Sequence, residues 1–207
     1  MWKIVARFLL CGLMVSLVGC ASVDPVIKIG LVAPFEGQHR AVGYDAIYSA
    51  RLAVREINEA GGISGHRVAL VALDDSGDPE LAQQTAQSLV IDPAVVAVLG
   101  HWLPETTAVA APIYEEAGLP FVPLGESPFM PSDPAALPAE FQAAYAEVTP
   151  FEETAVAYAG ATYDAFQLLW QALEVADERT GQLDRASVAN GLTGLEYEGM
   201  TGLVYLP

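Results

Sequence analysis

Residues 26–75 read VIKIGLVAPFEGQHRAVGYDAIYSARLAVREINEAGGISGHRVALVALDD, and this stretch decides the fold. Residues 26–33 form a short apolar run that is typical of a buried strand, and residues 34–43 are rich in turn formers. Apolar residues then recur at helical spacing, namely Ala46, Ile47, Ala50, Ala53, Val54 and Ile57. The glycine pair at 61–62 ends this helix, because glycine adopts the left-handed conformation without a Cβ clash, and residues 67–73 form the next strand. The stretch therefore predicts a βαβ unit.

The alternation of strands and helices continues as far as residue 122. Asp78 and Pro79 predict a helix entry, since the aspartate accepts hydrogen bonds from free amides and proline at the first position loses no needed donor. The predicted elements are a helix over 80–90, a strand over 94–99, a helix over 105–117 and a strand over 120–122. This alternation indicates an α/β fold in which helices flank a parallel, Rossmann-like sheet.

The pattern changes at residues 125–138, which hold four prolines and show no clear periodicity. We interpret this stretch as a junction. Helices are predicted beyond it over 140–147, 154–177 and 184–190, and a strand over 201–206. The predicted apolar face of the longest helix carries Ala155, Ala159, Thr162, Phe166, Leu169, Leu173 and Ala176. Its predicted polar face carries Asp164, Gln167, Gln171, Glu174 and Glu178.

The amino terminus has the features of a secretory signal. Residues 1–19 contain Lys3 and Arg7 followed by an apolar run, with no acidic residue. The sequence LVGC at 17–20 resembles the lipobox of bacterial lipoproteins, which implies that Cys20 is lipidated and that residues 20–25 form a tether. The alternative is a transmembrane anchor in which Cys20 is incidental. Both interpretations place the rest of the chain outside the cytoplasm, in the periplasm or on the outer cell surface.

Composition and motifs exclude several classes of function. The chain has 9 Lys plus Arg against 26 Asp plus Glu, a formal charge of -17, which repels phosphate backbones and argues against nucleic-acid binding. No GxSxG, GxGxxG or GxxxxGK[ST] motif follows a predicted strand. We therefore expect a protein that is not an enzyme, with no catalytic residues and no cofactor.

A metal site is not expected either. The three histidines, His39, His66 and His101, are far apart in sequence, and we expect them at turns or on the surface rather than around zinc. The acidic residues Asp74, Asp75 and Asp78 lie close together, but Asp78 is accounted for as a helix cap and the other two end a strand. Metal binding at this cluster is the alternative to that structural interpretation.

Ligands bind at the carboxyl ends of the strands in open parallel sheets, and three predicted loops lie there: 34–43, 100–105 and 123–128. The second reads GHWLPE and opens a helix, whose amino-terminal amides suit a ligand carboxylate, with Trp102 as an apolar wall. The alternative is that Trp102 packs locally. In the third loop Gly125, Glu126 and Ser127 suit an ammonium and a carboxylate, and the alternative is a turn without a ligand.

Five segments carry a family resemblance. IKIGLVAPFEG, AVREINEAGGISGHRVALVALDDSGDP, VVAVLGHW, APIYEEAGLPFVP and AYAGATYDAFQLLWQAL, in this order, closely resemble the type I periplasmic binding proteins of the leucine/isoleucine/valine-binding kind. The resemblance implies a lobe of a receptor in which two α/β lobes close on an amino acid or a similar small polar solute. It also implies delivery of the solute to an ABC permease.

The resemblance also implies the ligand contacts. The family's first-lobe positions correspond to Trp102, Leu103, Pro104, Gly125 and Ser127, and Tyr158 corresponds to a wall on the returning segment. Pro104 stands where the family commonly has a serine, and it offers neither a hydroxyl nor an amide. The hydroxyl of Ser127 stands where the family usually has a threonine or a serine.

The chain departs from the family in length. Residues 26–207 are expected to form one lobe, with most of the second lobe missing at about 125–138. The alternative is a minimal second lobe within 125–150. We expect an extracytoplasmic solute-binding lipoprotein of an ABC importer, attached to the membrane through its lipid. The alternatives are a single-lobe interaction or sensor protein at the membrane surface, completing its site as a homodimer, and a truncated receptor without transport activity.

Overall fold

The computed structural model describes residues 24–207. A four-stranded parallel sheet has the order β2-β1-β3-β4, with β1 at Val26–Ala33, β2 at Arg67–Asp74, β3 at Val95–Gly100 and β4 at Phe121–Pro123. The helices are η1 Gly37–His39, α2 Arg40–Glu59, α3 Pro79–Ile91, α4 Pro104–Glu116, η2 Pro134–Ala136, α5 Ala139–Val148, α6 Ala159–Thr180 and α7 Arg185–Leu192. A small hairpin of β5, Glu196–Gly199, and β6, Gly202–Tyr205, follows. The predicted α/β class with a parallel sheet is confirmed.

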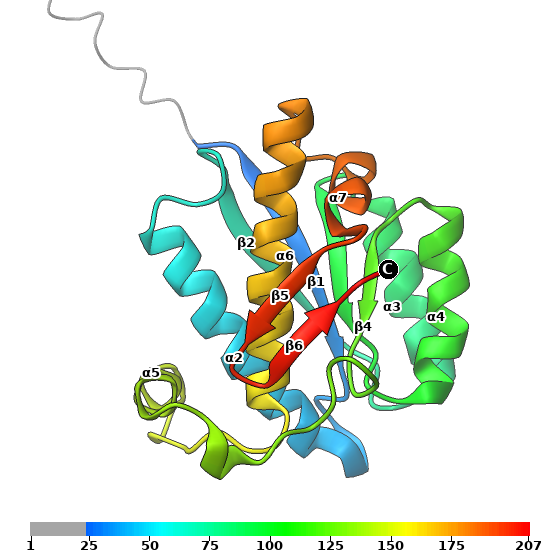
Figure 1. Cartoon of the computed structure of the whole chain (residues 1–207). Helices are drawn as coiled ribbons and strands as arrows, with labels where there is room; N and C mark the ends of the chain where they lie inside the picture. Colours follow the sequence, from blue (N-terminus) through cyan, green and yellow to red (C-terminus); the bar gives the residue numbers. More distant parts are fainter. Residues whose placement is uncertain (1–23) are drawn as a thin grey trace, which may run out of the picture.

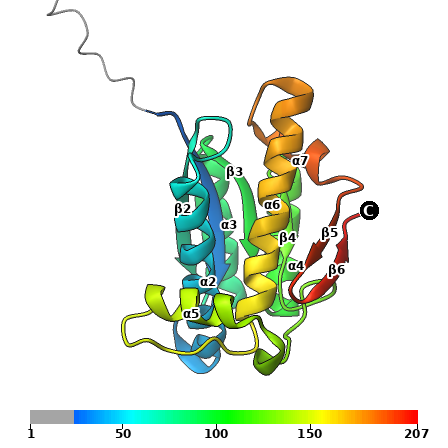
Figure 2. The same cartoon turned by 60° about the vertical axis from the view of Figure 1, so that its left-hand side comes forward.

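Helices cover both faces of the sheet, as Figures 1 and 2 show. On one face α2, α6 and α7 pack over a core that includes Ile29, Leu31 and Phe166. On the other face α3 and α4 pack over a smaller core that includes Val32 and Tyr114. Successive residues of a strand point to opposite faces, so a strand buried on both sides must be apolar throughout. This is the reason why β1 reads as a continuous apolar run.

The strand order creates a switch point. The chain leaves β1 for β2 on one side and later enters β3 on the other side of β1. Because the two connections run over opposite faces of the sheet, the carboxyl ends of β1 and β3 mark the position where open α/β sheets bind ligands. The loops after these two strands and after β4 lie at this edge.

Two predictions for the longest helix are wrong. The helix α6 begins at Ala159, not at 154, because the amides of Val156 and Tyr158 donate to the buried carboxylate of Asp45 and leave the helical path. Asp164 does not lie on a polar face. It is fully buried and accepts hydrogen bonds from the amides of Met200 at 3.1 Å and Thr201 at 2.8 Å.

The carboxyl-terminal strand predicted over 201–206 is confirmed as β6. Its antiparallel partner β5 was not predicted, because the sequence EYEG is short and half exposed. Residues 125–138 form loops and the short helix η2, and their interpretation as a junction stays a prediction. Helix α5 follows and packs on α2 through Phe141 and Tyr145.

The signal, the lipobox at Cys20 and most of the tether lie outside the described residues. Within 24–207, no helix combines the length and the apolar character that a membrane span requires.

Candidate functional site

The first loop of the carboxyl edge is held by a strand-end carboxylate. Asp74 Oδ1 accepts hydrogen bonds from the amide of Phe35 at 2.7 Å and from that of Ser76 at 2.8 Å. Desolvation raises the pKa of Asp74, but hydrogen bonds from Ser76, Phe35 and Glu36 outweigh it and lower the pKa. The aspartate is therefore a structural anion that ties the end of β2 to the loop after β1.

A buried polar network lies beneath the second loop. His101 Nδ1 is 3.0 Å from Asp75 Oδ2, and His101 Nε2 is 3.0 Å from the hydroxyl of Tyr114. With Nδ1 donating to the carboxylate, Nε2 accepts from Tyr114. Burial raises the pKa of Tyr114, and the charge of Asp75 adds to that shift. His101 was predicted at a turn or on the surface: its backbone turns with φ 46°, but its side chain is fully buried, so a surface position is wrong for this histidine.

Two glycines allow the three loops to approach closely. A Cβ on Gly100 would lie 2.0 Å from the carbonyl oxygen of Val32, and a Cβ on Gly125 would lie 2.5 Å from that of Trp102. Both glycines have positive φ, at +132° and +82°. Only glycine fits such positions, so the second loop is pressed against β1 on one side and against the third loop on the other.

Three of the predicted ligand residues come together at this edge. The rings of Trp102 and Tyr158 meet edge to face with centroids 5.3 Å apart, and Gly125 lies against Trp102. Trp102 is only 5% exposed, and its indole N–H is buried without a hydrogen-bond acceptor in the described part of the chain. Trp102 thus packs into the core and also carries an unused donor.

The other three predicted residues lie nearer the surface. The side chain of Leu103 is directed toward Gly77, since a Cβ on that glycine would meet Leu103 Cδ1 at 2.9 Å. Pro104 and Ser127 are exposed. Leu103 and Ser127 lie in the loops of the carboxyl edge and Pro104 is the first residue of α4, and their contact with a ligand stays a prediction.

The helix at this edge offers few free amides. Helix α4 begins at Pro104, which has no amide hydrogen, and the amide of Thr106 already donates to the carbonyl of Leu103 at 3.1 Å. The amide of Glu105 remains in the first turn. A ligand carboxylate would therefore find fewer backbone donors here than at an ordinary helix start.

Asp45 is a residue of this edge that was not predicted from the sequence. It lies on α2, is 2% exposed, and accepts from the amide of Tyr158 at 2.7 Å and from the Tyr145 hydroxyl at 2.9 Å. Burial raises the pKa of Asp45, although its hydrogen bonds oppose the shift. Helical spacing did not mark it, because successive residues of a helix lie about 100° apart and Asp45 falls nearer to Glu59 than to Ala50. By holding the backbone of residue 158, Asp45 positions the ring that packs on Trp102.

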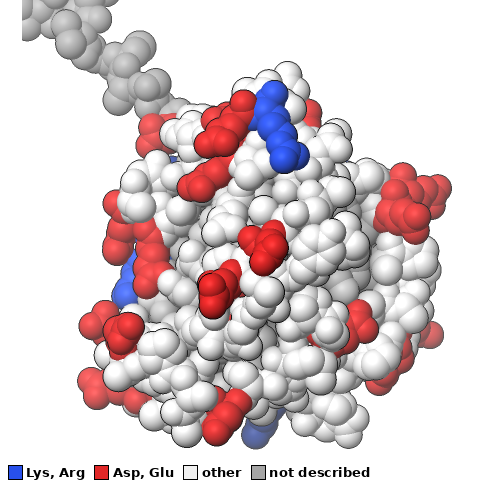
Figure 3. All heavy atoms as spheres, in the orientation of Figure 1, with Lys and Arg blue, Asp and Glu red and all other residues white. Residues whose placement is uncertain are grey.

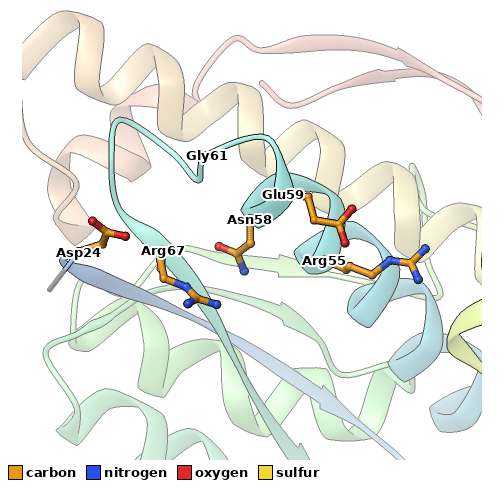
Figure 4. A pocket seen from close by; sticks show the side chains of 6 residues that line it. All are labelled: Asp24, Arg55, Asn58, Glu59, Gly61 and Arg67. Carbon is orange, nitrogen blue, oxygen red and sulfur yellow. The ribbon is translucent and has the colours of Figure 1, made fainter.

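A hollow of about 440 Å³ lies at the opposite edge, near the start of β1 and β2. Figure 4 shows Arg55 and Arg67 around it together with the carboxylates of Asp24 and Glu59. The lining carries two positive and two negative side chains, so its net formal charge is zero. Within residues 24–207, no group of three His, Cys, Asp or Glu is placed to hold a metal ion.

Comparison with known proteins identifies the family. A family model described as periplasmic binding protein matches residues 26–134. The chain belongs to the periplasmic binding protein family. This periplasmic binding protein is of type I, of the Leu/Ile/Val-binding-protein kind, so the resemblance inferred from the sequence is confirmed.

The relatives of this periplasmic binding protein are matched over part of their length. An amino acid binding protein of Pseudomonas aeruginosa is 36% identical over 93 residues, which cover 45% of this chain and 25% of that protein. A leucine-specific-binding protein of Salmonella typhimurium is 31% identical over 114 residues, covering 55% and 31%. This chain therefore matches less than a third of either relative.

A solved structure shows the same fold. It is the branched-chain amino acid transporter substrate binding protein LivJ from Streptococcus pneumoniae in complex with isoleucine. Its TM-score is 0.72 at 16% identity, over 88% of this periplasmic binding protein and 92% of that chain.

Proposed function

We propose that the protein binds a small polar solute, an amino acid of the branched-chain type or a related compound, at the carboxyl edge of its sheet. One observation carries the proposal: three loops converge at the switch point, beside the buried and unused indole donor of Trp102. A buried donor without an acceptor is unfavourable, and a solute carboxylate would supply one. The names of the relatives, which include a leucine-specific-binding protein, support this ligand class.

The proposed role is delivery of the solute to an ABC permease, with no chemistry of the protein's own. The protein would act outside the cytoplasm, attached through lipidated Cys20. Growth with an alkyne-labelled fatty acid tests the anchor. The wild-type chain should carry the label and the Cys20→Ala variant should not. Absence of the label from the wild-type chain would show that Cys20 is not lipidated.

Thermal unfolding with a panel of L-leucine, L-isoleucine, L-valine, small amides and carboxylates tests solute binding. A ligand at about 100 times its Kd should add about 2.7 kcal/mol to the free energy of unfolding. That gain raises the midpoint by roughly 2–4 °C per kcal/mol in a domain of this size. No shift with any compound would exclude the proposed role.

Variants locate the site. Trp102→Phe keeps the aromatic ring but removes the indole donor, so it should weaken binding about tenfold. Ser127→Ala should weaken binding too. Trp170→Phe is the matched control, because the indole of Trp170 is also buried without an acceptor but lies on α6. Equal effects of the two tryptophan variants would place the ligand elsewhere.

A partner-binding role is the second candidate. Met130, Phe151 and Val156 expose 53%, 84% and 57% of their surfaces in the two segments that flank α5. Exposed apolar side chains of this size favour association, and a second copy of the chain is the simplest partner. Sedimentation equilibrium distinguishes the roles: a dimer that Phe151→Ser dissociates supports the second candidate.

A further inference from the structure

A second cavity lies outside the three loops. A groove of about 370 Å³ is formed between α2, α5 and α6, and none of its lining residues belongs to the loops of the carboxyl edge. Small-molecule sites usually have volumes of roughly 300–1,000 Å³. The groove therefore has room for one compact organic molecule.

Most of the side chains that line the groove are apolar. Leu52 is fully buried, Phe141 is 5% exposed, and the rings of Phe141 and Tyr163 meet with centroids 5.1 Å apart at an angle of 66°. Met200, from the turn of the hairpin, completes the apolar wall. These surfaces suit an aliphatic or aromatic body, and the ring faces also attract cations.

A carboxylate is fixed on one wall. The hydroxyl of Tyr163 donates to Glu56 Oε2 at 2.6 Å, which orients the carboxylate and leaves Oε1 for another donor. The pKa of Tyr163 is raised by burial and by this hydrogen bond to Glu56. No cationic side chain of residues 24–207 forms an ion pair with Glu56 within 4.0 Å. The adjacent Arg55 pairs with Glu147 instead, at 3.5 Å.

The charge of the groove is one-sided. Its lining includes a second carboxylate, Glu140, and no Lys, Arg or His. The whole chain carries -17, and acidic side chains far outnumber basic ones on the face drawn in Figure 3. The field at the groove therefore attracts a cation and repels a carboxylate.

We propose that this groove binds a small organic cation, a primary amine with a compact apolar body. Its ammonium group donates to the free oxygen of Glu56, and its apolar body packs on Phe141 and Met200. An amino acid does not fit this site well, because its carboxylate would face Glu56 and Glu140. The groove is thus chemically distinct from the proposed solute site and does not depend on it.

An NMR titration of the purified protein with 3-methylbutylamine tests the proposal, with 3-methyl-1-butanol as the neutral isostere. The amine should move the amides of residues 52–56, 140–144 and 163 in a saturable manner. The alcohol should bind about tenfold more weakly, because it carries no positive charge to pair with the Glu56 carboxylate. L-Leucine, which shares the apolar body, should leave these amides in place.

Variants sharpen the test. Glu56→Gln keeps an acceptor for the Tyr163 hydroxyl but removes the charge, so it should weaken amine binding about tenfold. Glu115→Gln, at an exposed position on α4, removes the same charge elsewhere and should change nothing. Equal binding of amine and alcohol, or shifts confined to other residues, would overturn the proposal. The isostere comparison uses the unmodified chain and stays decisive if Glu56→Gln does not fold.

Discussion

Residues 26–124 and 125–207 are held in place by different forces. The first region is a regular alternation of strands and helices whose strands pair along the main chain, as β1 does with β2 over eight residues. The second region adds no strand to this sheet, and its hairpin pairs only with itself. Its helices α6 and α7 pack on one face of the sheet, whose strands all belong to the first region (Figure 1).

The second region is fastened by isolated polar side chains across long sequence separations. Asp45 binds the backbone before α6, Asp164 binds the turn of the hairpin, and Arg185 donates to main-chain carbonyls that include those of Val95 and Asp92. Both aspartates are buried without a cationic partner among the described residues. Both regions share the apolar core, and the first adds close backbone packing to it, whereas the second adds single acceptors and donors.

The largest effect is expected from crowding the first region. Gly100→Ala would place a Cβ 2.0 Å from the Val32 carbonyl oxygen, and we expect a loss of more than about 4 kcal/mol in the free energy of unfolding. Gly118→Ala is the control, since it also has positive φ but its Cβ would meet nothing within 4 Å. It should lose about 1 kcal/mol. Similar urea midpoints for the two variants would disprove the close approach of β1 and β3.

The next effect tests the fastening of the second region. Asp164→Ala removes the acceptor of the Met200 and Thr201 amides, and we expect a loss of about 2–3 kcal/mol. Asp164→Asn keeps one carbonyl oxygen and should lose about half as much. Hydrogen exchange should accelerate at these two amides more than in β1. Uniform acceleration across both regions would show that the hairpin is not a separate unit.

The same difference explains what the sequence could predict. The strands of the first region are apolar runs bounded by turn formers, and the Asp78 cap has a local signal, so both were predicted and are observed. The start of α6 was predicted five residues early. Its true start depends on Asp45, which is more than a hundred residues away, and no local pattern carries that information.

The features of the candidate site likewise divide into those that a local pattern predicts and those that depend on distant residues. The three loops were predicted from the alternation of strands and helices, because this alternation implies a parallel sheet and the carboxyl ends of parallel strands share one edge. The burial of His101 was not predicted, since it depends on Asp75 and Tyr114 meeting it from two other elements. A polar residue next to a strand end looks exposed in the sequence until its partners are known.

A third prediction concerns pH. Because burial raises the pKa of Asp45 above its ordinary value of 3.8, the folded state binds this proton more tightly than the unfolded state. The stability that Asp45 contributes is therefore present at low pH and is lost as the pH rises through the raised pKa. Relative to that of Asp45→Asn, the free energy of unfolding of the wild type should increase as the pH falls from 7 toward 4.

Comparing the wild type with Asp45→Asn separates the effect of Asp45 from that of carboxyl groups whose pKa values are lowered. Asp74, Asp92 and Asp184 have lowered pKa values, so their contribution is lost as the pH falls and affects both proteins equally. Urea unfolding at several pH values measures the difference. A constant difference would show that Asp45 keeps an ordinary pKa in the folded state.

The smallest effect is expected where the two regions touch through side chains. Tyr158→Phe keeps the edge-to-face contact with Trp102 and should change the free energy of unfolding by less than about 0.5 kcal/mol. Tyr158→Ala removes the ring and should lose about 1–2 kcal/mol. Asp45 holds the amide of residue 158 rather than its side chain, so both variants should keep the backbone in place. The tryptophan fine structure of the near-ultraviolet circular dichroism spectrum should change only in Tyr158→Ala. If Tyr158→Phe loses as much stability as Tyr158→Ala, the hydroxyl of Tyr158 rather than its ring joins the two regions, in addition to the backbone amides that donate to Asp45.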